Sequence, residues 1–475
     1  MKMLLAGQPV DRERKLDVLD PYDGSLVDRV PAADAADVGA AIAAAVEGYR
    51  ENRGLPAHER VTTMLRAARL VEERSEEFAR TIAREGSKTI REATKEVGRA
   101  VNTLTLSGEE GRRLLGETIP FDTAPGSENR WGYYYRFPIG VIAAITPFND
   151  PLNLVAHKLG PALVSGNAVV LKPATATPLS ALLLGQALMD AGVPPRALSV
   201  LTGRGAEIGE PLVADERVRM VSFTGGIEAG RMITRQAGLK KIGMELGSNS
   251  PVIVLADADI PQAVELTVSG AFWAAGQNCI GAQRVYIEKP VYDEFERRFA
   301  ERTSQVRTGP KLDEATDMGP LISEAEAERV EGWVREAVDA GARVLAGGTR
   351  AGAVMEATAL ADIPPGVALD CQEVFGPVVG LYPVESLDEA IERSNGVDFG
   401  LHAAIFTRDI DRAHHAIRHL EAGGIMVNDS TDYRLDAMPF GGVKGSGLGR
   451  EGIRFALQEM TEPKVVCFNL RPDPA

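Results

Sequence analysis

The stretch VIAAITPFNDPLNLVAHKLGPALVSGNAVVLKP, residues 141–173, decides the fold class. Its apolar runs Val141–Thr146 and Ala168–Lys172 predict buried strands, and the segment Asn153–Ser165 between them predicts a helix. Two strands joined through a helix form a β-α-β unit, in which the strands lie parallel. The stretch therefore predicts part of a parallel sheet.

The same alternation continues towards the C-terminus. Further strands of the first series are expected at Leu198–Leu201, Met220–Phe223 and Lys241–Glu245, separated by helices over 178–191, 206–214 and 228–237. A second series begins at Pro251 and continues through Arg284–Glu288, Val344, Val378–Pro383, Ala403–Phe406 and Gly424–Val427. Repeated units of this kind predict an α/β fold whose parallel sheets are covered by helices and bind ligands at the carboxyl ends of their strands.

The regions outside the two series have other patterns. Residues 31–117 are rich in helix formers, for example Arg60–Glu85 and Ile90–Gly111. Turn residues and an aromatic run in Thr118–Arg136 indicate an exposed strand excursion. Lys464–Leu470 is strand-like but has no obvious partner in its own neighbourhood.

Composition limits the function classes. The length of 475 residues predicts two or three packed units. A formal charge of −15 without a basic face disfavours nucleic acid as a partner. The apolar runs are too short to cross a membrane. The apolar stretch near the N-terminus is too short for the apolar region of a signal peptide, so a cytoplasmic protein is expected. Three cysteines suggest neither a disulfide framework nor a metal site.

Two residue types point to acyl chemistry. Cys279 follows Gly276-Gln277-Asn278, beyond a helix expected over Ala263–Ala275. A thiolate attacks carbonyl carbon and can leave again after acylation. Glu245 ends an expected parallel strand, where a carboxylate can act as a general base. Either residue alone is more often structural, and only the pair favours catalysis.

A glycine-rich turn adds a phosphate-binding candidate. Residues 223–230, FTGGIEAG, lie between an expected strand and an expected helix. Glycines there let phosphate oxygens approach backbone N–H groups at the positive end of a helix. The turn is not the G-x-G-x-x-G dinucleotide fingerprint, so it is only moderately informative.

Seven motifs occur in a characteristic order. They are Pro147-Phe148-Asn149, Leu171-Lys172-Pro173-Ala174, Phe223-Thr224-Gly225-Gly226, Glu245-Leu246-Gly247, Gly276-Gln277-Asn278-Cys279, Glu373-Val374-Phe375-Gly376-Pro377, and Pro439-Phe440-Gly441-Gly442-Val443-Lys444 running on to Gly449-Arg450-Glu451. With them the chain resembles the aldehyde dehydrogenase superfamily over essentially its whole length. The resemblance implies a Rossmann-like cofactor domain, an α/β catalytic domain and a bridging β arm.

The resemblance also implies a catalytic mechanism. Cys279 would attack the aldehyde, and the Asn149 amide with the Cys279 backbone N–H would hold the oxyanion. Hydride would pass to the nicotinamide, and Glu245 would activate the water that hydrolyses the thioester. Lys158 and Glu451 would form an outer proton relay. Because relatives that transfer the acyl group to coenzyme A lack such a base, a free acid is the expected product.

Cofactor positions follow from the same resemblance. Lys172 would bind the adenosine ribose, Gly225 and Gly226 the pyrophosphate, and Glu373 the nicotinamide ribose, with Phe375 beside the nicotinamide. The other implied cofactor positions are Thr146, Pro147, Phe148, Gly205, Gly209, Phe223 and Leu246.

Some positions depart from the family pattern. Thr175 stands where NAD-preferring members usually carry a glutamate that repels a 2′-phosphate, so NADP should be tolerated and either preferred or used alongside NAD. Gly226 replaces a common serine. Ser248 and Asn249 replace the usual Gly-Lys continuation, and the sequence does not indicate with what consequence.

The implied substrate tunnel is mostly polar. Its lining would be Asp150, Leu154, His157, Asn278, Ile280 and Arg434. Arg434 would clamp an anionic tail, or else be a surface arginine paired with Asp432 or Asp436. Asp150 would attract an amino group instead, or pair with His157 or Arg434. The expected substrate is a small hydroxylated or anionic aldehyde, as in the lactaldehyde, phosphonoacetaldehyde and semialdehyde branch, with an aminoaldehyde as the alternative.

The resemblance further divides the chain. Residues 1–117 and 138–246 would bind the cofactor, 247–440 would form the catalytic domain, and 118–137 with 455–475 would form the arm that joins a homodimer or homotetramer. Two other readings remain: a structural homologue without turnover, and a cysteine hydrolase acting on esters. The first is disfavoured because Cys279, Glu245 and Asn149 are all present, and dependence on a nicotinamide cofactor tests the second.

Overall fold

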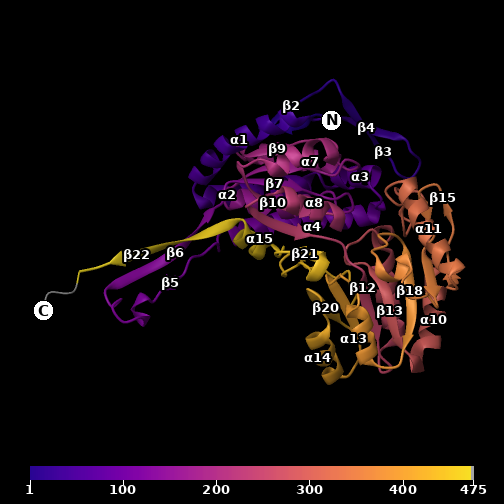
Figure 1. Ribbon diagram of the computed structural model, residues 1–475. Coiled ribbons are helices and arrows are strands. Elements are labelled where there is room, and N and C mark those ends of the chain that lie inside the picture. The colour runs from indigo at the N-terminus through magenta and orange to yellow at the C-terminus, as the bar shows by residue number, and fades with distance from the viewer. Residues whose placement is uncertain (472–475) are drawn as a thin grey trace.

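The computed structural model describes residues 1–471, which form two α/β bodies and a projecting arm (Figure 1). The first body is built on an eight-stranded sheet. In spatial order its strands are β2 (Gln8–Val10), β1 (Met3–Leu5), β9 (Leu198–Val200), β8 (Ala168–Lys172), β7 (Val141–Ile145), β10 (Val218–Thr224), β11 (Lys241–Glu245) and β21 (Gly447–Leu448). The five strands from β9 to β11 are parallel, as the first sequence series predicted.

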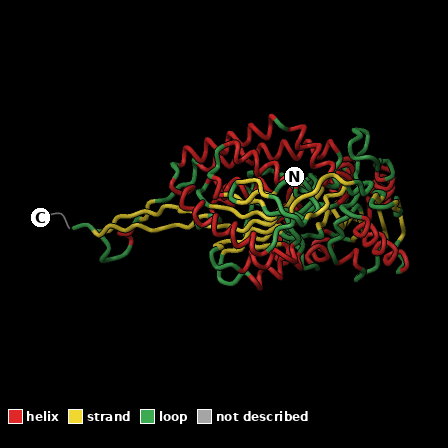
Figure 2. The backbone as a smooth tube through the Cα atoms, turned by 90° about the horizontal axis from the view of Figure 1, so that it is seen from above, coloured by secondary structure: helices red, strands yellow, loops and turns green. Residues whose placement is uncertain are grey.

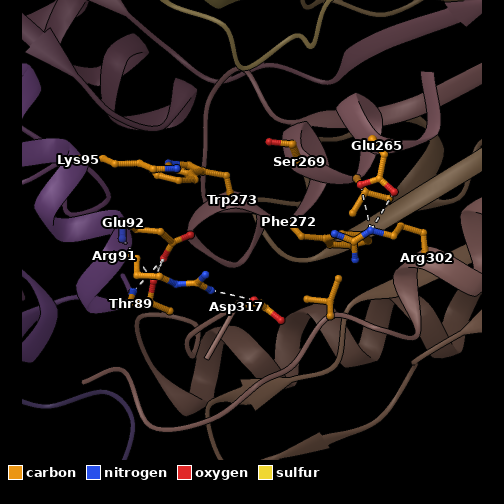
Figure 3. A pocket seen from close by; sticks show the side chains of 12 residues that line it. Thr89, Arg91, Glu92, Lys95, Glu265, Ser269, Phe272, Trp273, Arg302 and Asp317 are labelled. Carbon is orange, nitrogen blue, oxygen red and sulfur yellow. Dashed lines mark hydrogen bonds and ion pairs between the residues drawn. The ribbon is translucent and has the colours of Figure 1, made fainter. Parts of the chain in front are cut away.

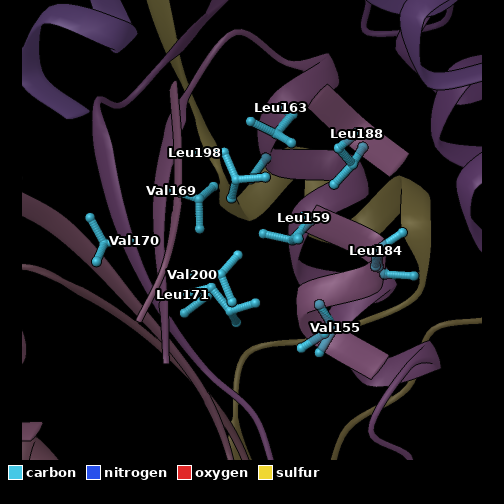
Figure 4. Close-up of a cluster of buried hydrophobic side chains, with 14 of the residues drawn as sticks. Val155, Leu159, Leu163, Val169, Val170, Leu171, Leu184, Leu188, Leu198 and Val200 are labelled. Carbon is cyan, nitrogen blue, oxygen red and sulfur yellow. The ribbon is translucent and has the colours of Figure 1, made fainter. Parts of the chain in front are cut away.

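Helices cover both faces of this sheet. They are α1 (Ala35–Gly54), α2 (Ala57–Glu73), α3 (Ser75–Glu85), α4 (Ile90–Gly111), α5 (Asn153–Val164), α6 (Leu179–Ala191), α7 (Gly205–Ala214), α8 (Ile227–Gln236) and α15 (Ile453–Glu459). Every residue of β7, β8 and α5 is buried, which explains their nearly unbroken apolar sequence. Figure 4 shows Leu159 of α5, Leu188 of α6 and Val169 of β8 in one cluster of buried side chains.

Arg74 leaves the helical region, so the helix-rich stretch Arg60–Glu85 is divided between α2 and α3. One expectation at the boundary with the second body is corrected. The helix expected over Ala263–Ala275 ends at Phe272, because the backbone turns left-handed at Ala274. A hairpin of β3 (Lys15–Leu19) and β4 (Leu26–Pro31) precedes the helical region and was not predicted.

The second body is built on a seven-stranded sheet. Its strands in order are β14 (Arg343–Ala346), β17 (Thr358–Ala361), β18 (Val378–Val384), β13 (Ala282–Glu288), β12 (Ser250–Val254), β19 (His402–Phe406) and β20 (Gly424–Val427). All but β14 are parallel, as the second series predicted. The helices of this body are α9 (Ile260–Phe272), α10 (Lys289–Thr303), α11 (Glu324–Asp339), α12 (Ala368–Cys371), α13 (Leu387–Asn395) and α14 (Ile410–His419).

The arm is a three-stranded sheet that projects from the first body (Figure 2). β22 (Thr461–Asn469) pairs along its whole length with β6 (Arg130–Pro138), which also pairs with β5 (Thr118–Ile119). The tail that seemed to lack a partner therefore has one in its own chain, more than 300 residues away, which sequence proximity does not reveal. The segment expected as 455–475 includes the end of α15, which packs on α5. Residues 472–475 lie outside the described residues.

Within residues 1–471, no helix is both long and apolar enough to cross a membrane.

Candidate active site

A cavity of about 460 Å³ lies where loops of the two bodies meet. The first body contributes the Asn149 loop (residues 146–152, between β7 and α5) and the end of β11. The second body contributes the Cys279 loop (residues 273–281, between α9 and β13). Nine of the expected catalytic and substrate residues line the cavity: Cys279, Glu245, Asn149, Glu451, Asp150, Leu154, Asn278, Ile280 and Arg434.

The Cys279 loop is shaped by an unusual backbone. Ala274, Ala275 and Gly276 take φ values of 52°, 55° and 69° in succession. Left-handed conformations cost an alanine about 1 kcal/mol each, and such strain gathers at functional sites. A Cβ at Gly276 would lie 2.1 Å from the Gly376 carbonyl oxygen, so only glycine fits there.

The thiol of Cys279 lines the cavity, and the residue is partly exposed. Burial raises the pKa of Cys279 to about 12, although the charge of Arg434 opposes the rise. The side-chain oxygen of the neighbouring Asn278 accepts a hydrogen bond from the Ile280 N–H at 3.2 Å. A raised pKa favours the protonated thiol, which must lose its proton before it can attack a carbonyl.

Glu245 and Glu451 form a coupled acid pair behind the thiol. Glu245 is 4% exposed, and its Oε2 has no hydrogen-bond partner within the described chain. Burial, together with the charge of Glu451, raises the pKa of Glu245 well above its usual range. Burial would also raise the pKa of Glu451, but Lys158 and Arg434 overcome this and lower it to about 2. The pKa values of these two neighbouring carboxyl groups are therefore displaced in opposite directions.

The expected relay partners are in contact. Nζ of Lys158 lies 3.0 Å from Oε1 of Glu451 and donates to Oγ of Ser222 on β10 at 3.1 Å. Lys158 does not line the cavity but lies behind Glu451. A chain of ionisable groups therefore leads from Glu245 through Glu451 to Lys158.

Arg434 lies in the cavity wall and is not a surface arginine. Its side chain is 6% exposed, and its guanidinium stands 3.7 Å from the centroid of the Phe440 ring. Its ion-pair partner is Glu451, at 3.1 Å, so the expected pairing with Asp432 or Asp436 is wrong. The guanidinium is held between the relay and the cavity.

Asp150 and His157 also have other partners than expected. Asp150 pairs with Lys88 and, at 3.3 Å, with Arg99, so the expected pairing with His157 or Arg434 is wrong. His157 is buried, does not line the cavity, and bonds to Asp436 at 3.0 Å. It points behind the tunnel because its position on α5 faces α4 and the 436 segment. His157 is therefore not a lining residue.

The residues expected to bind the adenosine half of a cofactor gather at one place. Lys172 ends β8, and burial lowers its pKa to about 8. A Cβ on Gly205, the first residue of α7, would lie 3.9 Å from Cε of Lys172, and Gly209 follows one turn later. Thr175 donates a hydrogen bond to the Gly203 carbonyl at 3.1 Å. The end of β8 and the start of α7 therefore bring together an ammonium, a hydroxyl and the start of a helix.

The pyrophosphate and nicotinamide positions also fit a dinucleotide. Gly226 begins α8 with no side-chain cap, leaving backbone N–H groups for phosphate. The buried hydroxyls of Thr146 and Thr224 lack partners among residues 1–471. Glu373 accepts the Ser248 N–H at 2.9 Å, and burial raises its pKa to about 7.

The remaining cofactor positions shape the walls of this site. Phe375 packs edge-on against Phe148, with ring centroids 5.7 Å apart, next to Pro147. Phe223 is buried beneath the glycine turn, where a Cβ on Gly225 would come within 2.6 Å of its ring. Leu246 follows Glu245 and packs against α8.

The structure gives Asn249 a role that the sequence left open. Its side-chain N–H groups donate to the carbonyls of Asp370 and Gln372, both at 3.1 Å, and its oxygen accepts from Arg284 at 2.8 Å. Together with the Ser248 N–H, Asn249 fixes the segment that carries Glu373. Of the two departures from the family pattern, only Asn249 acts through its side chain; Ser248 contributes a backbone N–H that any residue would offer.

Several cavity residues were missed because no motif marks them. Arg99, Lys95 and Trp273 line the catalytic cavity, and Lys95 and Trp273 also line a neighbouring hollow of about 450 Å³ (Figure 3). Nζ of Lys95 lies 5.0 Å from the centroid of the Trp273 ring. Lys95 and Trp273 therefore border both the exposed hollow and the catalytic cavity.

Comparisons with known proteins agree with this geometry. The Aldehyde dehydrogenase family profile matches residues 9–466. The chain is 49% identical over 458 residues to aspartate-semialdehyde dehydrogenase 1 of Pseudomonas canavaninivorans, covering 96% of this chain and 97% of that protein. It is 45% identical over 456 residues to 3-sulfolactaldehyde dehydrogenase of Priestia aryabhattai, covering 96% and 95%.

A solved structure extends the likeness to three dimensions. NADP-dependent glyceraldehyde-3-phosphate dehydrogenase from Bacillus halodurans C-125, complexed with NADP, superposes with a TM-score of 0.97 at 37% identity, covering 99% of both chains. The chain belongs to the aldehyde dehydrogenase family. It is an NAD(P)-dependent enzyme that oxidises aldehydes.

Proposed function

We propose that this enzyme oxidises a small, polar, anionic or hydroxylated aldehyde to the free carboxylic acid through a thioester on Cys279. The observation that carries the proposal is one cavity lined by Cys279, Asn149, Glu245 and Glu451. These groups supply a nucleophile, an oxyanion donor and a base with its relay. A bound nicotinamide supplies the hydride acceptor.

Acylation uses the two loops. The Cys279 thiol loses its proton to the relay that begins at Glu245, and the thiolate sulfur bonds to the carbonyl carbon. The developing oxyanion accepts hydrogen bonds from the Asn149 amide and the Cys279 N–H. Donors fixed in a water-poor site are worth about 10²–10³ in kcat. When the C–H bond breaks with its electron pair, the carbonyl re-forms as a thioester.

Hydrolysis uses Glu245. Water adds to the thioester carbonyl while Glu245 takes its proton, and cleavage of the C–S bond returns Cys279 as a thiolate. A base of raised pKa is suited to this step, because it holds the proton it takes and passes it on at neutral pH. Glu451 and Lys158 carry the proton away from Glu245.

The charges around the cavity support an anionic substrate. Arg434, Arg99 and Lys95 all line it, and the lining also contains the carboxyl groups of Asp429 and Asp432. Asp150 is the acid that would favour an aminoaldehyde, but Lys88 and Arg99 already neutralise it. Two relatives are named for aldehydes that carry an acid group: 3-sulfolactaldehyde, and aspartate semialdehyde, which carries an amino group as well.

For the cofactor we propose NADP, with NAD accepted. Thr175 carries no charge to repel a 2′-phosphate, and Lys172 lies beside it. Arg204 follows Gly203, to which Thr175 bonds, and would add a second cation at this edge. The related glyceraldehyde-3-phosphate dehydrogenase binds NADP.

We further propose that residues 1–117 and 138–246 bind the cofactor, that 247–440 carry the catalytic thiol, and that the arm joins copies of the chain. The exposed aromatic residues on the arm support the last point.

The test is the initial rate of NADP and NAD reduction with lactaldehyde, succinic semialdehyde, phosphonoacetaldehyde, an aminoaldehyde, hexanal and benzaldehyde. The anionic members and NADP are expected to give the highest kcat/KM, and Cys279→Ala is expected to abolish turnover. Preference for the aminoaldehyde would contradict the substrate class. Absence of turnover with every aldehyde would favour the alternative of a structural homologue without turnover.

A further inference from the structure

The N-terminal part of α4 contains two buried carboxylates that the proposed chemistry does not use. Glu92 and Glu96 lie four residues apart, on one face of the helix, and are 4% and 1% exposed. Glu92 and Glu96 accept their hydrogen bonds from groups outside α4. Both reach out to the backbone of a catalytic loop.

Glu96 holds the Asn149 loop. Its Oε1 accepts the backbone N–H groups of Leu152 and Asn153, at 2.8 and 3.0 Å. These groups stand where the loop enters α5, three and four residues after Asn149. A carboxylate there satisfies N–H groups that a helix start leaves free and favours the positive helix end.

Glu92 holds the Cys279 loop. Its Oε1 accepts the Ala274 N–H at 2.8 Å, at the first of the three left-handed residues before the catalytic thiol. Its Oε2 accepts from Thr89 at the start of α4. The strained backbone is thus tied to the same helix as the Asn149 loop.

Lys88 completes the arrangement. Its buried ammonium donates to Oε2 of Glu96 at 2.8 Å and pairs with Asp150, the residue after Asn149. Ser87, one residue earlier, donates to the Gln277 side chain in the Cys279 loop at 3.5 Å. Both loops are therefore bonded to polar groups in Ser87–Glu96.

We infer that Glu92, Glu96 and Lys88 are positioning residues that set the Asn149 amide against the Cys279 thiol. Asn149 and Cys279 come from different bodies of the chain, and α4 is the element that bonds to both loops. The distance between nucleophile and oxyanion donor then depends on this rigid helix. The inference rests on the oxyanion role proposed for Asn149.

The test is a double-mutant cycle between Glu96 and Asn149. Asn149→Ala is expected to lower kcat by about 10²-fold or more. Glu96→Ala is expected to lower kcat by about tenfold or more, because a small displacement of an aligned group is costly, while KM for NADP stays within twofold. In the Asn149→Ala background the same change is expected to cost less than about threefold, since the group it positions is gone.

A matched control is Glu85→Ala. Glu85 is equally buried and accepts the backbone N–H groups of Leu179 and Ser180 at 2.6 and 2.8 Å, but it serves α6. It is expected to lower Tm at least as much as Glu96→Ala and to keep kcat. NADPH fluorescence titration identifies folded protein in every variant.

The outcomes distinguish the oxyanion role proposed for Asn149 from the positioning role inferred for Glu96. Unchanged kcat in Asn149→Ala would contradict the oxyanion role and the proposed function. A large loss in Asn149→Ala with unchanged kcat in Glu96→Ala, or with fully additive losses in the double variant, would overturn the positioning inference alone. A kcat loss in Glu85→Ala equal to that in Glu96→Ala would also overturn it, because loss of stability would then suffice.

Discussion

Oε2 of Glu451 lies 3.1 Å from Nη2 of Arg434. The contact joins a cavity-lining cation to the carboxylate next to Glu245, so one arginine bears on both substrate binding and proton transfer. Its positive charge lowers the pKa of Glu451 and opposes the rise in the pKa of Glu245. Arg434 therefore contacts the proposed proton relay as well as lining the proposed substrate site.

Arg434→Ala should move the acid limb of the kcat–pH profile to higher pH. Without the nearby positive charge the pKa of Glu245 rises further, and the ionised base appears only at higher pH. KM for an anionic aldehyde should also rise, by about tenfold, for loss of a charged contact worth about 1.4 kcal/mol. Arg434→Lys keeps the positive charge, so its acid limb should stay close to the wild-type pH. An acid limb that does not move in Arg434→Ala would contradict an effect of Arg434 on the pKa of Glu245.

Glu245→Gln should release one equivalent of reduced cofactor per active site and then stall. The amide cannot take a proton from water, so the thioester on Cys279 persists. A stopped-flow trace of NADPH absorbance measures the burst, and mass spectrometry measures the acylated chain. Cys279→Ala should show no burst at all. Continued steady turnover at the wild-type rate in Glu245→Gln would remove Glu245 from the hydrolysis step.

The sequence predicted what local patterns and motifs encode. Apolar runs such as Val141–Ile145 identify parallel strands because both of their faces are buried. The residues Glu245 and Cys279 were identifiable because their motifs are contiguous, and the structure brings both to one cavity.

The sequence-based predictions that were wrong concern residues whose partners are distant in the chain. Asp150 is neutralised by Lys88, 62 residues earlier, and β22 pairs with β6 across more than 300 residues. His157 stands at a position expected to line the substrate tunnel, yet its place on α5 directs its side chain towards Asp436. No local pattern specifies such pairings, because the chain brings these groups together only when it is folded.

Thr175→Glu should change the cofactor preference from NADP to NAD. A carboxylate at this edge would repel the 2′-phosphate, and at an effective dielectric of about 20 a close charge pair is worth a few kcal/mol. KM for NADP should rise by more than about tenfold, with a smaller change for NAD. Thr175→Gln is a neutral control of the same size. Equal losses for the two cofactors in Thr175→Glu would contradict this assignment.

NADPH affinity should fall between pH 7 and pH 9 more steeply than NADH affinity. Burial lowers the pKa of Lys172 to about 8, so its ammonium loses its proton over this range and its attraction for a phosphate is lost. NADH lacks the 2′-phosphate and should respond less. Fluorescence titrations of both cofactors at the two pH values measure the difference, and parallel slopes would contradict a role for Lys172 at the phosphate.

Lys95→Ala should raise KM for anionic aldehydes and leave lactaldehyde nearly unchanged. Lys95 stands where the exposed hollow meets the catalytic cavity, in a protein whose formal charge of −15 otherwise repels anions (Figure 3). An exposed charge is screened, so a rise of about three- to tenfold that disappears at high salt is expected. Lys289→Ala, an exposed lysine on α10, is the control. Equal effects on charged and neutral aldehydes would contradict steering by Lys95.

The arm should hold copies of the chain together. Trp131 on β6 and Phe468 on β22 are 71% and 48% exposed, and large apolar side chains on a projecting strand pair mark a contact surface. Analytical ultracentrifugation should show an oligomer for the wild type and smaller species for Trp131→Asp with Phe468→Asp. Ile410→Asp, on α14, changes a residue that is 68% exposed on the body and should leave the oligomer intact. A wild-type monomer, or an oligomer that survives the arm changes, would contradict assembly through the arm, because burying two carboxylates in an apolar contact costs several kcal/mol.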